Sequence, residues 1–477
     1  MHAEALRRSF FAPPSQHSTE THRDQPVDER RPGLSPAPRR FRNPLSPAPR
    51  RAMNRSPSAR LSTLMFLEFF VWSAWYNMVA VYMAHHGMND LTFWPFTVNP
   101  IAAIIAPFFL GLIADRYFAT EKVLGWLHIL GAVTMFFVPQ ATSSPVLFIG
   151  LLLLYNLFYM PTLGLANSLA FHHITNQEKQ FPLIRVFGTI GWIVAGLLTS
   201  FVLSRFVVGG IAEQTSAPLY MTAVASLVLG IFSFTLPHTP PPAKGQEVSV
   251  RSILGIDALK ELGSRSFYVF IISSLLICIP LAAYYNYTQL YLGVAGVTKI
   301  TATLSIGQMG EAVLILLMPL LFVRLGVKWM LLLGMGSWVL RYALFALAAP
   351  SAVFWMIVVG IALHGFCYDF FFVTGQIYVD KKSSPAIRGQ AQGFLVFVTY
   401  GVGMVIGAQV AGWVYNGFLG TGPGLTLQQW ETFWWIPAAF AAAVAIFFGL
   451  TFYDRVDPRA ERAPEVTVPA ATAEPGL

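Results

Sequence analysis

Charged and polar side chains inside long apolar segments are the residues of this chain that could do chemistry. Gln308 and Glu311 lie three residues apart in one such segment, and His364, Tyr368 and Asp369 lie close together in another. A spacing of three or four residues places side chains on the same face of a helix. An amide, two carboxylates, an imidazole and a phenol that face a common space could bind a polar ligand and exchange a proton.

A second group of candidate binding residues precedes these in the chain. Arg185 and Thr189 are four residues apart and Trp192 follows three residues later, so the three can share a helix face. Glu68 adds a carboxylate in the first apolar segment. Arg185 has an alternative interpretation, because a long basic side chain near the end of a membrane helix can extend to the interface.

Each of these residues also has a purely structural interpretation, in which its hydrogen bonds only hold helices together. That interpretation suits a single glutamine better than two carboxylates and a histidine, because Ser or Asn could do the same at lower cost. Two other residues are expected to be structural: Arg341 as the partner of an acid elsewhere, and His128 as a histidine that is satisfied locally. The spacing from His364 to Asp369 occurs in some acyltransferases, but its position inside an apolar segment argues against that chemistry.

The composition indicates the class of protein that carries these residues. Of the 477 residues, 55% are hydrophobic and 11% are charged, whereas about 25% are charged in a typical soluble domain. The mean hydropathy is +0.57. These values indicate an integral membrane protein and exclude a soluble enzyme, a secreted disulfide scaffold and a nucleic-acid-binding protein. The two cysteines, Cys278 and Cys367, lie in apolar runs and the sequence has no metal-ligand spacing, so we expect neither a metal nor another cofactor.

Twelve apolar runs, each long enough to cross roughly 30 Å of hydrocarbon, follow one another from Leu61 onward. The longest connection, 237–266, divides them into six and six, with halves at 61–236 and 267–453. The predicted fold is therefore an all-α membrane protein of twelve transmembrane helices in two six-helix halves. The expected spans are 61–83, 92–114, 123–141, 145–171, 182–204, 217–236, 267–293, 302–325, 328–348, 352–377, 388–416 and 429–453.

Basic residues in the connections predict the orientation of the chain. Fifteen Lys and Arg residues fall on one side, counting those after the last span, and only two, Arg205 and Lys299, fall on the other. Because basic residues gather on the cytoplasmic side of a membrane protein, both termini are predicted to be cytoplasmic.

The two ends of the chain differ in composition from the part between them. Residues 1–60 lack an apolar run, are rich in Pro and Arg, and repeat the string LSPAPRR at 34–40 and 45–51. This composition predicts a disordered tail. It is either a cytoplasmic arm attracted to anionic lipid or the product of a start codon assigned too early. Residues 454–477 are expected to form a second disordered tail, and 237–266 a cytoplasmic loop.

Several strings resemble those of known transporter families. The segment GLIADRYFATEK resembles the Asp-Arg loop of the major facilitator superfamily, in which Gly111, Asp115 and Arg116 would form a conformational-switch loop. The strings YMPTLGLANSLAF, FPLIRVFGTIGW, SIGQMGEA, YDFFF and SPAIRGQAQG are similar, in this order, to strings of the bacterial nucleoside:proton symporter family within that superfamily. The resemblance covers about 61–453 and leaves out both tails.

The resemblance implies a substrate site to which both halves contribute. Substrate-contacting positions of the family correspond here to Arg185, Thr189, Trp192, Gln308, Glu311, Tyr368 and Asp369.

The sequence departs from the family at three candidate site positions. His364 takes the place of a tyrosine, Tyr285 lies near a position that carries an amide, and Glu68 takes the place of a glutamine. These three residues remain candidates for the site, but the departures leave the identity of the substrate open.

The resemblance predicts a proton-coupled transporter, not an enzyme, that imports nucleosides by alternating access. Asp369 is the first choice for the acid that carries the coupling proton, Glu68 is the second, and Glu311 is a further candidate. The alternatives are a carrier for another small polar metabolite, such as a sugar, and a membrane sensor that does not transport. The expected partners are a small-molecule substrate and the lipid bilayer, without nucleic acid, and the expected form is a monomer in the inner or cytoplasmic membrane.

Overall fold

The computed structural model describes residues 55–109, 117–241, 255–384, 387–420 and 422–454, and these residues form helices without any strand. Both predicted tails lie almost wholly outside the described residues. The predicted switch loop also lies outside them, because Gly111, Asp115 and Arg116 fall in the gap at 110–116.

In the described residues, the first half of the chain contains seven α-helices and several short 3₁₀ and π turns. Its first helix begins at Arg55, inside the segment expected to be disordered. The helices are α1 (Arg55–Tyr76), α2 (Val79–His85), α3 (Trp94–Phe109), α5 (Thr120–Phe137), α6 (Pro145–His173), α7 (Gln177–Leu197) and α8 (Ala217–Ser233), with η1 (Asn89–Leu91), η3 (Pro139–Ala141), η4 (Leu198–Val202), η5 (Leu203–Arg205) and η6 (Ala212–Gln214) between them.

The second half is preceded by a short helix inside the expected central loop, α10 (Ile256–Leu262). Its longest helix, α12, is two helices joined at Gly326, whose φ of 70° only glycine adopts readily. The elements are α11 (Arg265–Val294), α12 (Ile300–Ala348), η7 (Ala349–Ser351), α13 (Phe354–Ala362), α14 (His364–Tyr368), η8 (Asp369–Val373), α15 (Thr374–Lys382), α16 (Arg388–Val396), η9 (Phe397–Gly403), α17 (Met404–Leu419) and α18 (Leu427–Thr451).

The membrane-spanning character of these helices confirms the predicted class. Eleven helical segments in the described part of the chain are long and apolar enough to cross a membrane, and each overlaps one of the expected spans. The twelfth expected span corresponds to α8, which is apolar but has only 17 residues. The count of twelve therefore stays a prediction.

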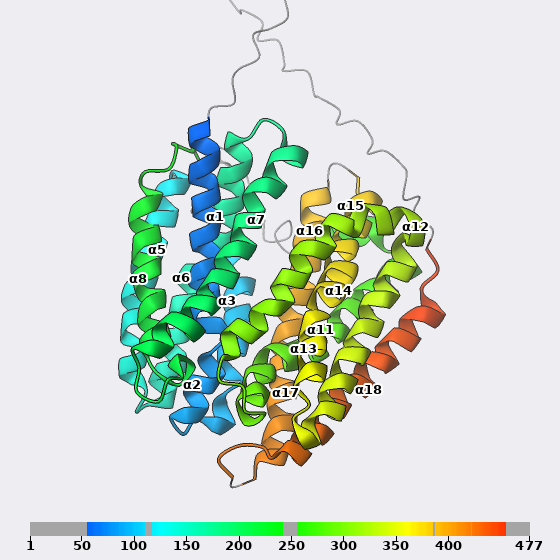
Figure 1. The fold of residues 1–477 in the computed structure, drawn as a ribbon. Coiled ribbons are helices and arrows are strands. Elements are labelled where there is room, and N and C mark those ends of the chain that lie inside the picture. The colour runs from blue at the N-terminus through cyan, green and yellow to red at the C-terminus, as the bar shows by residue number, and fades with distance from the viewer. Residues whose placement is uncertain (1–54, 110–116, 242–254, 385–386, 421, 455–477) are drawn as a thin grey trace, which may run out of the picture. The chain divides into compact units, whose positions relative to one another are not determined.

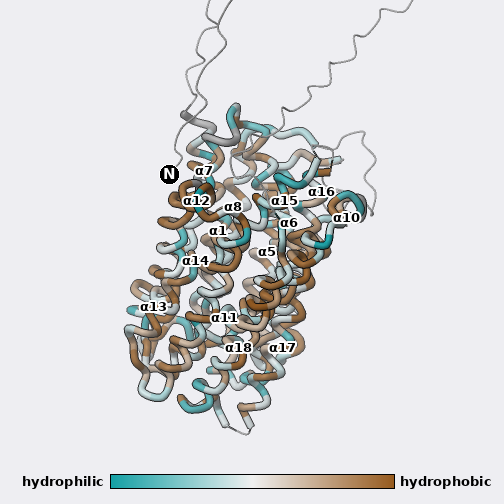
Figure 2. Tube along the Cα trace, turned by 90° about the vertical axis from the view of Figure 1, so that its right-hand side faces the viewer, coloured by the Kyte–Doolittle hydropathy of each residue, from teal (hydrophilic) through white to brown (hydrophobic). Residues whose placement is uncertain are grey.

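Hydrophobic residues predominate along much of the helices (Figure 2), and many of their side chains are exposed. Large hydrophobic side chains such as Val146, Leu316 and Trp413 are 84%, 79% and 78% exposed. A soluble protein rarely leaves so many of these side chains in water. Their exposure suits a surface that contacts lipid hydrocarbon.

The two halves form two helical bundles, α1 to α8 and α11 to α18 (Figure 1). We call the end at which α1 begins and α18 ends the proximal end, and the opposite one the distal end. Contacts that mark the proximal end include Arg60 donating to the Thr235 carbonyl at 2.9 Å and Lys328 donating to the Gly449 carbonyl at 2.8 Å. The bundles lie apart at the proximal end and approach one another distally (Figure 1).

Helices α1 and α7 pack with almost no space between their backbones. A Cβ atom on Gly191 would lie 2.1 Å from the carbonyl oxygen of Phe66, so only glycine fits there. This contact fixes α7, and with it the helix face that carries Arg185.

Gly191→Ala is therefore expected to destabilise the protein by about 1–3 kcal/mol, because the helices must move apart to admit one methyl group. Gly150→Ala is the matched control. Gly150 lies in α6, and a Cβ atom added to it would meet no atom within 4 Å, so alanine there is expected to be neutral or slightly stabilising. Thermal unfolding of both variants in detergent measures the difference, and equal unfolding temperatures would contradict the expectation.

Candidate functional site

A cavity of about 420 Å³ lies between the two halves. The first half contributes side chains from α1, α6 and α7, and the second half contributes side chains from α11, α12, α14 and the elements that follow α14. Asn167, near the proximal end of α6, and Gln376 in α15 also line it, so the lining extends toward the proximal end.

The cavity brings together most of the residues predicted from the sequence, from both halves of the chain. Asp369 is not among the residues that line it. The predicted residues that line it are Glu68, Arg185, Thr189, Trp192, Tyr285, Gln308, Glu311, His364 and Tyr368.

Arg185 is held inside the molecule by an aromatic ring. Its guanidinium carbon lies 3.9 Å from the centroid of the Phe69 ring, a distance typical of a cation–π contact. From α7 it is close enough to Glu311 and Tyr368 in the other half to interact electrostatically with both. Arg185 therefore faces the cavity, and the alternative of extension to the membrane interface is wrong.

The polar group of the second half is assembled by two glycines that let α12 and α14 approach closely. A Cβ atom on Gly365 would lie 2.8 Å from the Cα of Glu311, and one on Gly307 would lie 2.9 Å from the Cβ of His364. The resulting separation between His364 Nε2 and Glu311 Oε2 is 3.9 Å. Gln308 is 9% exposed and its amide oxygen has no hydrogen-bond partner among the described residues, so it is available to a ligand.

Aromatic rings form much of the remaining wall. Trp72 lies 5.6 Å from Trp192 and 6.1 Å from Tyr400, measured between ring centroids, and both contacts are edge-on. Tyr285 contacts Tyr76 of the other half at 5.8 Å. These rings offer faces on which a planar ligand could stack.

Trp72, Tyr76 and Tyr400 were not singled out from the sequence as site residues. Aromatic residues make up 14% of the chain, so their type alone does not separate cavity walls from lipid-facing surfaces. The signal that could have found Trp72 is its four-residue spacing from Glu68, which places both on one face of α1.

Asp369 lies one residue beyond the cavity-lining Tyr368 and is fully buried. It begins η8, a π-helical turn, a local irregularity often found at functional sites. Neither of its carboxylate oxygens has a hydrogen-bond partner among the described residues. The structure therefore does not bring Asp369 into contact with the cavity, and it leaves a buried carboxyl without the partners that would stabilise its charge.

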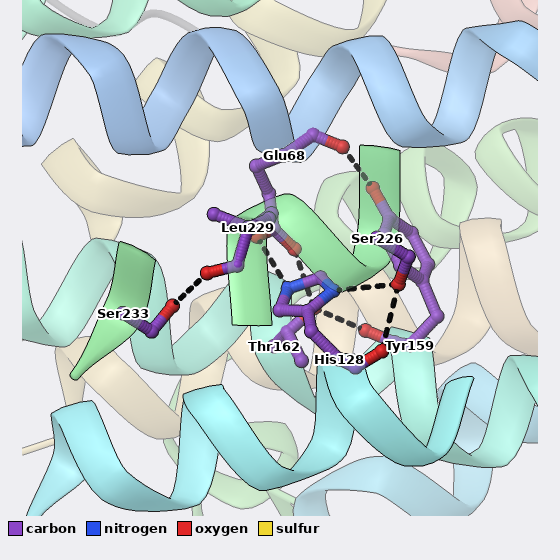
Figure 3. Close-up of polar contacts among 7 residues, drawn as sticks. All are labelled: Glu68, His128, Tyr159, Thr162, Ser226, Leu229 and Ser233. Carbon is purple, nitrogen blue, oxygen red and sulfur yellow. Dashed lines mark hydrogen bonds and ion pairs between the residues drawn. The ribbon is translucent and has the colours of Figure 1, made fainter. Parts of the chain in front are cut away.

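Glu68 takes part in a buried network that the sequence did not predict (Figure 3). His128 Nε2 lies 3.0 Å from Glu68 Oε2, and Thr162 donates to Glu68 Oε1. His128 also contacts the Ser226 hydroxyl on α8, with 3.3 Å between Nδ1 and Oγ. His128 is satisfied, as expected, but its partners come from α1 and α8 and include the carboxylate of Glu68.

Arg341 does not pair with an acid in the described part of the chain. It is fully buried, its Nε donates to the Gly360 carbonyl at 2.9 Å, and its guanidinium carbon lies 4.1 Å from the Tyr284 ring centroid. The expected carboxylate partner is therefore wrong. A carbonyl dipole and a ring face take its place.

Hydrogen bonds between the halves gather at the distal end in the described residues. Gln289 of α11 accepts from Ala80 N at 3.1 Å and donates to the Tyr76 carbonyl at 3.4 Å. Asn416 of α17 donates to the Asp90 carbonyl at 2.9 Å. We call these contacts, with that of Glu213 and Thr301, the distal seam. The seam closes the distal end, so the cavity is reached from the proximal end.

Glu213 is the charged member of the distal seam and is fully buried. Its Oε1 accepts from the Ser200 hydroxyl at 2.6 Å and, across the halves, from the Thr301 hydroxyl at 2.9 Å. Among the described residues, no group of three or more His, Cys, Asp or Glu side chains could hold a metal ion.

Comparison with known proteins gives a consistent set of relatives. A family model described as "Nucleoside H+ symporter" matches residues 55–457. The chain is 38% identical over 401 residues to YegT of Escherichia coli (strain K12), provisionally named a nucleoside transporter, with 83% of this chain and 93% of YegT covered. It is 31% identical over 415 residues to the nucleoside permease NupG of the same organism, with 82% and 95% covered.

A solved structure has the same arrangement of helices. The crystal structure of a variant of the nucleoside transporter NupG matches this chain with a TM-score of 0.76 at 30% identity. The match covers 83% of this chain and 100% of the other. The order of helices and the two-bundle arrangement are therefore those of a known transporter fold.

Proposed function

Because this chain belongs to the nucleoside H+ symporter family, a family of multi-pass membrane transporters and not of enzymes, we propose that it imports nucleosides together with protons by alternating access. The observation that carries the proposal is the cavity between the halves, where Arg185, Glu311 and Gln308 meet a wall of aromatic rings. Its volume of about 420 Å³ lies within the range of about 300–1,000 Å³ that is usual for small-molecule pockets.

The residues of the cavity match the chemistry of a nucleoside. Ribose hydroxyls can donate to the Glu311 carboxylate and accept from the Arg185 guanidinium, and the amide of Gln308 can do both. A planar base can stack on Trp192 or Tyr368. Thr189, Tyr285 and His364 complete the set of polar side chains that would distinguish one nucleoside from another.

Asp369 is the proposed carrier of the coupling proton, with Glu311 as the acid that links it to the ligand. The buried carboxyl of Asp369 has no hydrogen-bond donor or cation beside it among the described residues, which favours its neutral form. It follows directly after Tyr368 in the chain, so a change of its charge would act on the ligand-facing side of the same helix. No metal or other cofactor is part of the proposal.

The proposed membrane topology has twelve spans, with α8 as the sixth, and both termini in the cytoplasm of a cell whose inner membrane holds the protein as a monomer. Support comes from the excess of Lys and Arg in connections on one side. The proximal end would then face the cytoplasm, and the structure would represent an inward-open state. Gly111, Asp115 and Arg116 remain the proposed switch loop between two spans of the first half.

Trp192→Ala is expected to lower uridine affinity about tenfold, because stacking of a base on an aromatic ring is worth about 1–3 kcal/mol. Trp192→Phe is expected to retain most of the affinity, since a smaller ring face remains. Trp413→Ala, which removes an indole from the exposed outer surface of α17, is the control. Binding is measured by isothermal titration calorimetry, and equal affinity in Trp192→Ala and the control would contradict the stacking role.

The proposed function is tested with purified protein in liposomes. Thermal-shift measurements with nucleosides, bases and sugars identify the ligand class, and uridine counterflow establishes transport without a proton gradient. We expect stabilisation by nucleosides, counterflow, and accumulation driven by an inward proton gradient. Stabilisation by sugars alone would favour a carrier for another metabolite, and nucleoside binding without counterflow would favour a sensor.

A further inference from the structure

We propose that Glu68 and His128 together form a second proton-binding site, in the opposite half of the molecule from Asp369. The proposal rests on the proposed function, because a proton held there matters for transport only if the cavity carries a ligand. The two side chains lie within hydrogen-bond distance of one another in the network of Figure 3.

The pair is sealed between four helices of the first half. Glu68 on α1 is 0% exposed and His128 on α5 is 1% exposed. Thr162 on α6 and Ser226 on α8 complete the network. An uncompensated charge in such a place is costly, so the pair is stable either as two neutral groups or as imidazolium and carboxylate. Both forms hold one more proton than carboxylate with neutral imidazole.

The hydrogen bonds of the network also need that proton. Besides the bond from the Tyr159 hydroxyl to the Glu68 carbonyl, for which Tyr159 supplies the hydrogen, five contacts join Thr162 to Glu68 and to the Tyr159 carbonyl, His128 to Glu68, and Ser226 to the ring and to the carbonyl of His128. Each contact uses one hydrogen. Thr162 and Ser226 supply one each, and neutral His128 supplies a third. When Glu68 is a carboxylate and His128 is neutral, three hydrogens are available for the five contacts, so two contacts lack one. One added proton supplies a fourth hydrogen and leaves a single contact without one.

Few titratable side chains lie on the helices that surround Glu68 and His128. On α6, Tyr155 and Tyr159 interact electrostatically with Glu68. On α8, the titratable residue is Tyr220, whose ring packs on Phe136 at a centroid distance of 5.5 Å. On α1 and α5 the other charged groups with described side chains, such as Arg60 and Glu121, lie near the proximal starts of the helices.

Arg185 on α7 is a cation that lines the same cavity as Glu68. Its guanidinium packs on Phe69, the residue after Glu68. When the pair gives up its proton, Glu68 carries a negative charge in the wall of the cavity that Arg185 also lines. Glu68 then competes for Arg185 with Glu311 and with the ligand. Loss of the proton is therefore expected to weaken ligand binding, and binding of the ligand to favour protonation of the pair.

The pair is tested first without any ligand. Protons bound by the purified full-length protein in nanodiscs are counted by infrared difference spectroscopy as the pH is changed through the neutral range. We expect Glu68→Gln to lose one titrating group. We expect His128→Gln to keep a titrating carboxyl but to shift its titration, because the added proton then has only the carboxyl to bind.

A purely structural pair gives a different result. Glutamine at either position keeps hydrogen bonds to Thr162 or Ser226, so both variants would then retain the titration of the wild type, and the proposal would be overturned. If Glu68→Gln does not yield folded protein, the shift in His128→Gln carries the test on its own, and an unshifted titration there overturns the proposal as well.

The coupling to the ligand is tested with uridine. The uridine dissociation constant of the wild type is expected to rise up to about tenfold for each pH unit above the titration of the pair, and Glu68→Gln is expected to flatten this dependence. A wild type that binds no nucleoside would contradict the proposed function and leave the ligand-free titration as evidence for the pair. A pH dependence unchanged in Glu68→Gln would overturn the coupling.

Discussion

Asp369→Asn is expected to abolish the accumulation of uridine against its gradient while leaving counterflow intact. Asparagine has nearly the same shape as a protonated aspartic acid but cannot release a proton. In liposomes with a tenfold inward proton gradient, one coupled proton supports about tenfold accumulation of substrate. The variant is expected to reach only equal concentrations on both sides. Because Asp369 does not line the cavity, uridine binding is expected to change little.

Asp90→Asn is the matched control for this experiment. Asp90 is an exposed aspartate at the distal end whose side chain faces neither the cavity nor the Glu68 network. It is expected to accumulate uridine like the wild type. Undiminished accumulation in Asp369→Asn would remove Asp369 from the coupling role and leave Glu311 or the pair of Glu68 and His128 as the carrier.

Arg185→Gln is expected to weaken uridine binding by about thirtyfold or more. A ligand hydroxyl would lose a hydrogen bond to a charged group, which is worth about 1.5–3 kcal/mol, and Glu311 would lose the electrostatic interaction with a cation of the other half. The uridine affinity of Arg185→Lys is expected to lie between those of the wild type and Arg185→Gln. An ammonium keeps the charge but lacks the planar guanidinium group that can bind two oxygens. Isothermal titration calorimetry measures the uridine affinity of the wild type and of both variants.

Arg205→Gln provides the control for the loss of one positive charge. Arg205 is exposed and ends η5 near the distal end, remote from the cavity lining. Wild-type affinity in Arg185→Gln would mean that Arg185 serves only to pack on Phe69. Thermal unfolding of Arg185→Gln separates a loss of affinity from a loss of folded protein.

The helical class and the two groups of site residues could be predicted because they depend on local spacing. Glu311 and Gln308 share a face of α12 as expected, and a three-residue separation requires little else. The absence of Asp369 from the cavity lining could not be predicted in this way. A π-helical turn changes the angle between successive residues, and the sequence carries no clear mark of it.

Contacts between segments far apart in the chain also could not be predicted from the spacing of residues. His128 meets Glu68 across sixty residues of chain because α1 and α5 both pack against α6 and α8, and this packing depends on the shapes of many side chains. The same holds for Tyr400, which enters the wall of the cavity from the other half and donates to Asn99 at 2.6 Å. A histidine in an apolar helix gives no sign of which neighbour it will face.

The composition of the distal seam has a consequence for how readily the molecule changes state. Several of its links between the halves are single hydrogen bonds to backbone atoms, made by Gln289 and Asn416. Water can replace each of them when the halves separate, and such an exchange changes the free energy by only about 0.5–1.5 kcal/mol per bond. These links therefore add little to the free energy that separates the open and closed forms of that end, which leaves more of the binding energy of a small solute to shift the equilibrium between them.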